Sequence, residues 1–160
     1  MKKITFLFLL LSSFVWSQQQ TVNYSISPIS FEETQSITLT FNGSSINESS
    51  WGVTGNALYI WSWSLDSNNV SQDCPTNGSW TNSNETNKLI YNSVTDTYSI
   101  AFVPTAFYDR TSIARIGFLI KAKNATGDKK SQDIFTNVGA FQVNLTTPTL
   151  AQTLLSSGGN

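Results

Sequence analysis

Short stretches in which apolar and polar residues alternate recur along most of this 160-residue chain. Successive side chains of a β-strand point to opposite faces, so a period of two predicts strands with one buried face. The alternating stretches cover residues 22–26, 37–41, 57–65, 88–91, 98–103, 113–123, 134–135 and 140–145. After residue 17, no stretch repeats its apolar residues with the 3.6-residue period of a helix.

Polar segments between these stretches predict turns and one long loop. The hairpin loop around GDKK places Gly127 where a left-handed backbone is needed. Residues 66–87 have almost no apolar side chain apart from Val70, Cys74 and Trp80, which predicts a loop without strand or helix. Seven to eight short strands at roughly even spacing predict an all-β, immunoglobulin-like antiparallel sandwich.

The most apolar stretch, ALYIWSWSL at 57–65, predicts the central strand. Its large rings fall on one face and its aliphatic and small residues on the other, namely Tyr59, Trp61 and Trp63 against Leu58, Ile60 and Ser62. Leu58 and Ile60 are ordinary core residues. Three rings in register form either the main wall of the core or a binding platform, because indole and phenol groups combine apolar area with a polar tip.

The first 17 residues, MKKITFLFLLLSSFVWS, have the organisation of a secretory signal peptide. Two lysines precede an apolar run that is too short to span a bilayer stably, and a small-residue cleavage pattern precedes Gln18. We therefore expect a secreted or cell-surface protein without a membrane span. Its expected parts are a signal peptide at 1–17, a sandwich domain at 18–146, and a linker or disordered tail at 147–160 that leads into a downstream domain.

Composition and charge exclude several classes of function. Removal of Lys2 and Lys3 leaves 7 basic side chains beside 10 acidic ones, so nucleic acid is a poor partner. The absence of histidine excludes Ser-His-Asp and Cys-His catalysis and nearly all zinc sites. No two carboxylates stand at a motif spacing for glycoside hydrolysis. The lone Cys74 excludes an intrachain disulfide, and we expect no enzyme, metal or cofactor.

Two polar patterns keep alternatives open. The 66–73 loop fails the EF-hand pattern because Val70 stands at a ligand position, although another kind of calcium site from loop oxygens stays open. The chain also contains Asn-x-Ser/Thr sequons, among them those at Asn42, Asn69, Asn77, Asn84 and Asn124. Such sequons matter in a eukaryotic secretory pathway and also arise by chance in a chain this rich in Asn, Ser and Thr.

The aromatic residues have the chemistry of a sugar-binding surface. Indole faces stack on the C–H faces of pyranose rings, while amides and charges bind the hydroxyl groups. The candidate stacking residues are Tyr59, Trp61, Trp63 and Trp80, with Trp51 nearby in sequence, and the candidate polar partners are Lys121, Lys123, Asn82 and Gln72. The same tryptophans can instead be core residues.

Several motifs resemble those of a known domain. They are YSISPISFEETQSITLTF, WGVT, YIWSWSLD, CPTNGSW, FVPTAFY, RIGFLIKAKNATGDKKSQD and VGAFQVNL. Over residues 21–146 the chain resembles the N-terminal domain of secreted Bacteroidota proteins, often attached to α-amylase-type glycosidases or to sorting domains of the type 9 secretion pathway. The resemblance implies an early-set or immunoglobulin-like sandwich similar to starch-binding modules. It points to Trp61, Trp63 and Trp80 as glucan contacts, and also to Lys121 and Lys123.

From these observations we expect a non-catalytic carbohydrate-binding module for an α-glucan polysaccharide such as starch or glycogen. It would hold a tethered glycosidase on its substrate. The alternative is a structural spacer or interaction domain of a secreted multidomain protein. A small glycosidase is the third reading, and it lacks a recognisable acid pair.

Overall fold

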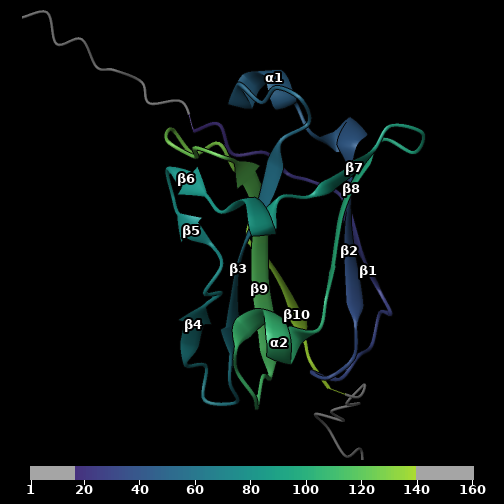
Figure 1. Cartoon of the computed structure of the whole chain (residues 1–160), viewed down its shortest axis with the longest axis vertical. Coiled ribbons are helices and arrows are strands. Elements are labelled where there is room, and N and C mark those ends of the chain that lie inside the picture. Colours follow the sequence, from purple (N-terminus) through teal and green to yellow (C-terminus); the bar gives the residue numbers. More distant parts are fainter. Residues whose placement is uncertain (1–16, 140–160) are drawn as a thin grey trace, which may run out of the picture.

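Two four-stranded antiparallel sheets pack face to face in the computed structural model, which describes residues 17–139 (Figure 1). The first sheet has the order β1-β2-β8-β7 and the second β10-β9-β3-β4. The first contains β1 (Tyr24–Ser27), β2 (Ile37–Asn42), β7 (Ile90–Asn92) and β8 (Thr97–Phe102). The second contains β3 (Leu58–Leu65), β4 (Ser71–Asp73), β9 (Arg115–Ala122) and β10 (Ile134–Asn137).

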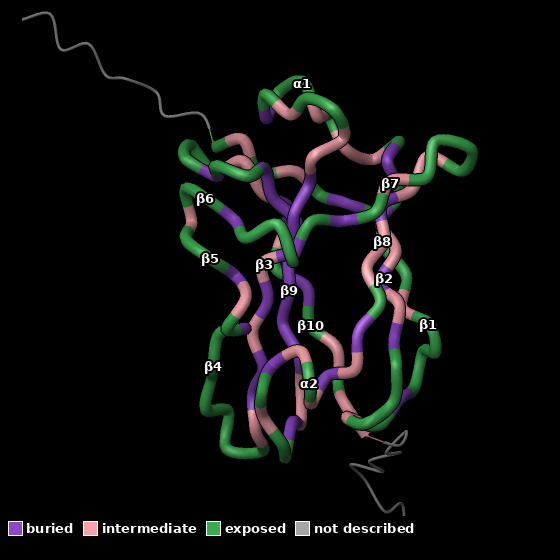
Figure 2. Tube along the Cα trace, in the orientation of Figure 1, coloured by how far each residue is buried: buried purple, intermediate pink, exposed green. Residues whose placement is uncertain are grey.

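The inner faces of the two sheets form the core, as the alternation predicts. In β2 the buried residues are Ile37, Leu39 and Phe41, and in β9 they include Ile116, Phe118 and Ile120. Leu58 and Ile60 of β3 lie in the same cluster. Figure 2 shows the buried segments of β3 and β9 in the middle of the fold, with exposed turns at both ends. The prediction of a mostly β, antiparallel architecture is confirmed.

The pairing of β3 with β9 fixes what stands on the outer face of the second sheet. Eight residue pairs run from Leu58 opposite Ala122 to Leu65 opposite Arg115. Directly opposite residues of an antiparallel pair share a face. Because Leu58 and Ile60 face the core, Tyr59, Trp61 and Trp63 stand together on the outer face. The alternation predicted that these three rings share a face, and it left open whether that face is the core or a binding surface.

The predicted loop at 66–87 differs from the structure, since it contains short elements. These are β4, the two-stranded β5 (Gly78–Ser79) and β6 (Asn82–Ser83), and the turn of 3-10 helix η2 (Glu85–Asn87). β4 pairs with the edge of β3 although its three residues are all exposed. A strand with no buried side chain leaves no period of two in the sequence, which is why the pattern missed it.

Three further short elements connect the strands. They are η1 (Gly43–Ser45), α1 (Glu48–Trp51) and α2 (Pro104–Tyr108). Gly127 has φ of +79°, which confirms the predicted left-handed position. The signal peptide up to residue 16, the predicted strand at 140–145 and the tail at 147–160 lie outside the described residues.

Candidate functional site

Four aromatic side chains lie on the outer face of the second sheet as two packed pairs. Trp80, from the turn between β5 and β6, packs edge to face on Trp61 with ring centroids 5.3 Å apart and planes at 79°. Trp63 packs in the same way against Phe135 of β10, at 5.5 Å and 78°. The three tryptophans are partly exposed, and Phe135 is 46% exposed. We call Trp61, Trp63, Trp80 and Phe135 the aromatic strip.

Trp63 occupies this position because the residue opposite it on β9 is glycine. A Cβ on Gly117 would lie closer than 3.0 Å to the Trp63 indole atoms Cε2, Nε1 and Cζ2. The indole therefore lies directly over the backbone of β9. Glycine is needed at position 117 because a side chain there would collide with the indole, and not because of a left-handed backbone. Phe135 is paired with Gly117 on the other side, so its ring meets the indole across the glycine.

Side-chain amides fasten the segment that carries Trp80 to the edge of β3. The Asn77 amide imitates a peptide group: its Nδ2 donates to the carbonyl of Ser62 at 2.8 Å, and its Oδ1 accepts from the Ser62 N–H at 3.1 Å. Asn87 Nδ2 donates to Asn77 Oδ1 at 3.3 Å, and Thr76 Oγ1 donates to Asn87 Oδ1 at 2.7 Å. Asn77 thus continues the strand edge beyond β4, and this places Trp80 over Trp61.

Lys121 lies buried beneath the two packed indoles. Its Nζ is 5.7 Å from the centroid of Trp61 and 5.3 Å from that of Trp80. It donates to Ser83 Oγ at 2.5 Å and to the carbonyls of Ala122 and Lys123 at 3.0 and 3.1 Å. Lys121 is 0% exposed. The sequence prediction of Lys121 as a direct ligand contact therefore does not fit this geometry, in which it holds the Trp80 segment against the sheet.

Burial without a carboxylate partner lowers the pKa of Lys121 to about 8 from an ordinary value of 10.5. Between these values the unfolded chain holds more protons than the folded one, so the free energy of unfolding rises with pH. We expect wild type to gain about 2 kcal/mol relative to Lys121→Met between pH 8 and 10.5. Urea unfolding of both proteins at pH 7, 9 and 10.5 measures this. Tyr59, Lys123 and Glu85, which lie next to Lys121, are common to both proteins, and a constant difference would contradict the assignment.

Tyr59 and Lys123 share one carboxylate at the upper end of the strip. The Tyr59 hydroxyl donates to Glu85 Oε1 and Oε2 at 3.0 and 3.2 Å, and Lys123 forms an ion pair with Glu85. Burial raises the pKa of Tyr59, and the hydrogen bond from Lys123 lowers that of Glu85. Tyr59 is 2% exposed, so it is not placed to stack on a ligand. Lys123 is exposed.

The remaining sequence candidates lie at different places. Asn82 is exposed in β6, and Gln72 of β4 donates through Nε2 to the carbonyl of Tyr108 at 3.2 Å. Trp51 is buried in the core, where its Nε1 donates to the carbonyl of Gln18 at 2.6 Å. The Cys74 thiol is buried as well, and burial raises its pKa. This environment makes the thiol unreactive.

Most of the sequons coincide with a local structural motif. Asn42 Oδ1 accepts from the N–H of Ser44, and Asn84 and Asn124 accept in the same way from the residue two positions on. These contacts are Asx turns, in which the Asn side chain accepts from a backbone N–H two residues on. In two of them the hydroxyl of the Ser or Thr at that position donates to the same Asn oxygen. Asn77 is 3% exposed with its amide bonded to Ser62. These contacts account for the repeated pattern without glycosylation.

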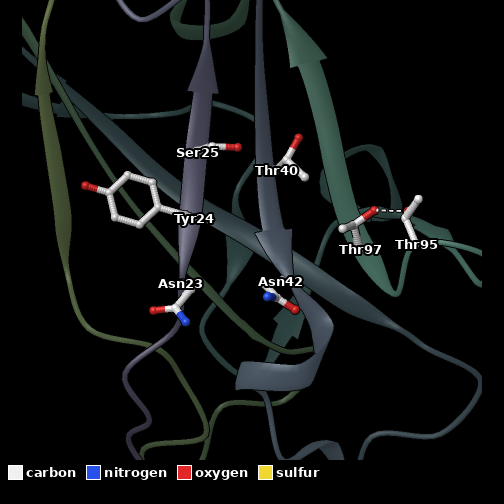
Figure 3. A pocket seen from close by; sticks show the side chains of 7 residues that line it. All are labelled: Asn23, Tyr24, Ser25, Thr40, Asn42, Thr95 and Thr97. Carbon is white, nitrogen blue, oxygen red and sulfur yellow. Dashed lines mark hydrogen bonds between the residues drawn. The ribbon is translucent and has the colours of Figure 1, made fainter.

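A pocket on the first sheet offers a different chemistry (Figure 3). Uncharged polar side chains dominate its lining, which consists of Asn23, Tyr24, Ser25, Thr40, Asn42, Thr95 and Thr97. The Tyr24 ring points away from the other labelled side chains in Figure 3, and it packs edge to face on Phe118 at 5.9 Å. The pocket thus lacks an aromatic platform, which the second sheet has.

Residues 17–139 contain neither a metal-binding cluster nor a membrane-spanning helix. No group of three or more His, Cys, Asp or Glu side chains there could hold a metal ion. None of the helices in this part of the chain has the length and apolar character needed to cross a membrane.

No family model matches the chain, and no curated protein is significantly similar to it. The residues that sequence reasoning missed are Gly117, Phe135, Arg115 and Asp73, which surround Trp63. Phe135 and Gly117 could have been noticed, because both lie in predicted strands. Their proximity to Trp63 could not, because it depends on the strand register.

Proposed function

We propose that this protein is a secreted, non-catalytic carbohydrate-binding module with an immunoglobulin-like, early-set sandwich, and that it binds an α-glucan such as starch or glycogen. The observation that carries the proposal is the partly exposed aromatic strip on the outer face of the second sheet. Soluble domains usually bury large rings, and an exposed patch of them marks a binding surface. The motif resemblance supports α-glucan as the ligand.

Stacking on the strip would supply most of the binding energy. Trp63 and Phe135 offer apolar faces and edges to sugar C–H groups, and their packing on each other and over Gly117 fixes them before the ligand arrives. Pre-ordered rings lose little side-chain entropy on binding. A modest affinity is sufficient for the proposed role, because a tether gives the neighbouring glycosidase a high effective concentration on a polymeric substrate.

The carboxylates support binding without catalysis, because most of them already have structural partners. Glu33 accepts from a backbone N–H and Asp66 from Arg110, while Glu85 and Asp133 are paired with lysines. Glycoside hydrolysis needs two carboxyl groups free to face the scissile bond.

We expect the full chain to be retarded in an affinity gel that contains amylopectin, and Trp63→Ala to abolish the retardation. Loss of the central ring removes the stacking surface and leaves the gap over Gly117. The matched control is Ile90→Ala, which removes another exposed apolar side chain, 71% exposed, from the opposite sheet. Retardation of Trp63→Ala equal to that of wild type, or no retardation of wild type on any polysaccharide, would remove the proposal.

A spacer or interaction domain is the alternative, and the mutual packing of Trp61, Trp80 and Lys121 favours it. Those three side chains stabilise one another without a ligand. Acrylamide quenching of tryptophan fluorescence separates the two functions in the same samples. Quenching that maltoheptaose relieves supports the binding module, whereas quenching that the sugar leaves unchanged supports the spacer.

A further inference from the structure

Strand register brings three side chains and a glycine into one row across the lower part of the aromatic strip. Asp73 of β4 is paired with Trp63 of β3, which is paired with Gly117 of β9, which is paired with Phe135 of β10. Arg115 lies two residues before Gly117 on the same face of β9. Trp63 is therefore flanked by a carboxylate on one side and by a guanidinium beside Phe135 on the other.

Arg115 is held in place without an acidic partner. Its Cζ lies 4.9 Å from the centroid of Phe135, and its Nε is shielded and has no hydrogen-bond partner within the described residues. All ten acidic side chains of the chain lie between residues 17 and 139, and none of the ion pairs there includes Arg115.

Arg110, the other arginine, has the acidic partner that Arg115 lacks. It bonds Asp66 Oδ2 at 3.0 Å and the carbonyls of Ser64 and Val70 at 3.2 and 3.0 Å. In Arg115 the shielded Nε is out of reach of a ligand, but the two terminal nitrogens have no hydrogen-bond partner within the described residues and are not shielded. These terminal N–H groups are therefore free to donate to a ligand acceptor.

Asp73 is the complementary group on the other side of Trp63. It is exposed, and no ion pair within residues 17–139 includes it. A carboxylate accepts hydrogen bonds and a guanidinium donates them. A hydroxyl group does both, so a ring bearing hydroxyls along both edges matches this row.

We propose that Trp63, Phe135, Asp73 and Arg115 form a subsite for one neutral pyranose ring. The ring stacks on Trp63 beside Phe135, its hydroxyls on one edge donate to Asp73, and those on the other edge accept from Arg115. This proposal rests on the proposed function and adds to it the residues that would contact one sugar ring. A carboxylated sugar is disfavoured, because Asp73 repels it and residues 17–139 carry 7 basic and 10 acidic side chains.

Affinity electrophoresis of the full chain on amylopectin and on polygalacturonate tests the subsite. We expect Asp73→Asn and Arg115→Gln each to weaken binding to amylopectin about tenfold, as for the loss of a hydrogen bond to a charged group. The matched controls are Asp109→Asn and Lys129→Gln, which remove the same charges elsewhere. Arg115→Lys keeps the charge but loses the planar group on Phe135, so it should rescue binding only in part.

The outcomes separate the two proposals. Amylopectin binding by wild type with unchanged affinity in Asp73→Asn and Arg115→Gln would overturn the subsite and leave the binding module standing. Tighter binding to polygalacturonate than to amylopectin would overturn the preference for a neutral ring. No retardation of wild type on either gel would end both proposals. Circular dichroism melting of each variant confirms that the fold is retained.

Discussion

Gly117→Ala is expected to remove glycan binding and to lower stability at the same time. The new Cβ would lie closer than 3.0 Å to three atoms of the Trp63 indole, and those atoms belong to a stiff ring that cannot bend away. Either the indole leaves the sheet or the β3–β9 pairing opens. Overpacking of this kind costs about 1–3 kcal/mol. We expect the melting temperature to fall by about 5 °C or more, and amylopectin retardation to be lost.

A double-mutant cycle shows whether the indole is the cause. In a Trp63→Ala background the space above Gly117 is empty, so Gly117→Ala should cost far less stability than in wild type. The control glycine is Gly127, whose Cβ would meet nothing within 4 Å but whose φ is +79°. Gly127→Ala should lose about 1 kcal/mol through backbone strain and bind amylopectin as wild type does. Additive effects of Gly117→Ala and Trp63→Ala would contradict the assigned contact.

The strands and their buried faces could be predicted from the sequence because each depends on a local period of two. That Tyr59, Trp61 and Trp63 share one face could also be predicted, since they alternate along a single strand, but whether that face is core or surface could not. What the sequence could not supply was the pairing of distant strands. Trp63 and Gly117 lie 54 positions apart in the sequence and meet through the pairing of β3 with β9. Nothing in the sequence near either residue predicts that pairing.

Burial of polar residues was the second feature that the sequence concealed. Lys121 alternates correctly for an exposed outer-face lysine, yet the Trp80 segment covers it. That segment is attached by amide side chains that lie in a stretch without apolar period. An Asn that replaces a backbone partner looks, in sequence, like any other loop Asn. The site therefore depends on one polar contact network, and its central member can be tested directly.

Asn77→Ala should destabilise the protein by about 2 kcal/mol and detach Trp80 from Trp61. The substitution leaves the buried N–H of Ser62 without a partner, and such an unsatisfied group costs about 1–3 kcal/mol. The Ser62 carbonyl loses one of its two donors and still accepts from the Cys74 N–H at 2.9 Å. We expect faster hydrogen exchange at the Ser62 amide, a shift of Trp80 emission toward longer wavelength, and weaker amylopectin retardation. The control Asn84→Ala removes an exposed Asx cap and should cost about 1 kcal/mol or less.

Asn77→Asp distinguishes the hydrogen bonds from simple loss of volume. The carboxylate can still accept from the Ser62 N–H, but its second oxygen faces the Ser62 carbonyl and repels it. Protonation turns that oxygen into a donor and restores the contact. Burial raises the pKa of such an acid in the folded state, so the variant should regain stability as the pH falls. If Asn77→Asp melted in parallel with wild type from pH 7 to pH 4, Asn77 would not be the anchor of the Trp80 segment, and the aromatic strip would need another support.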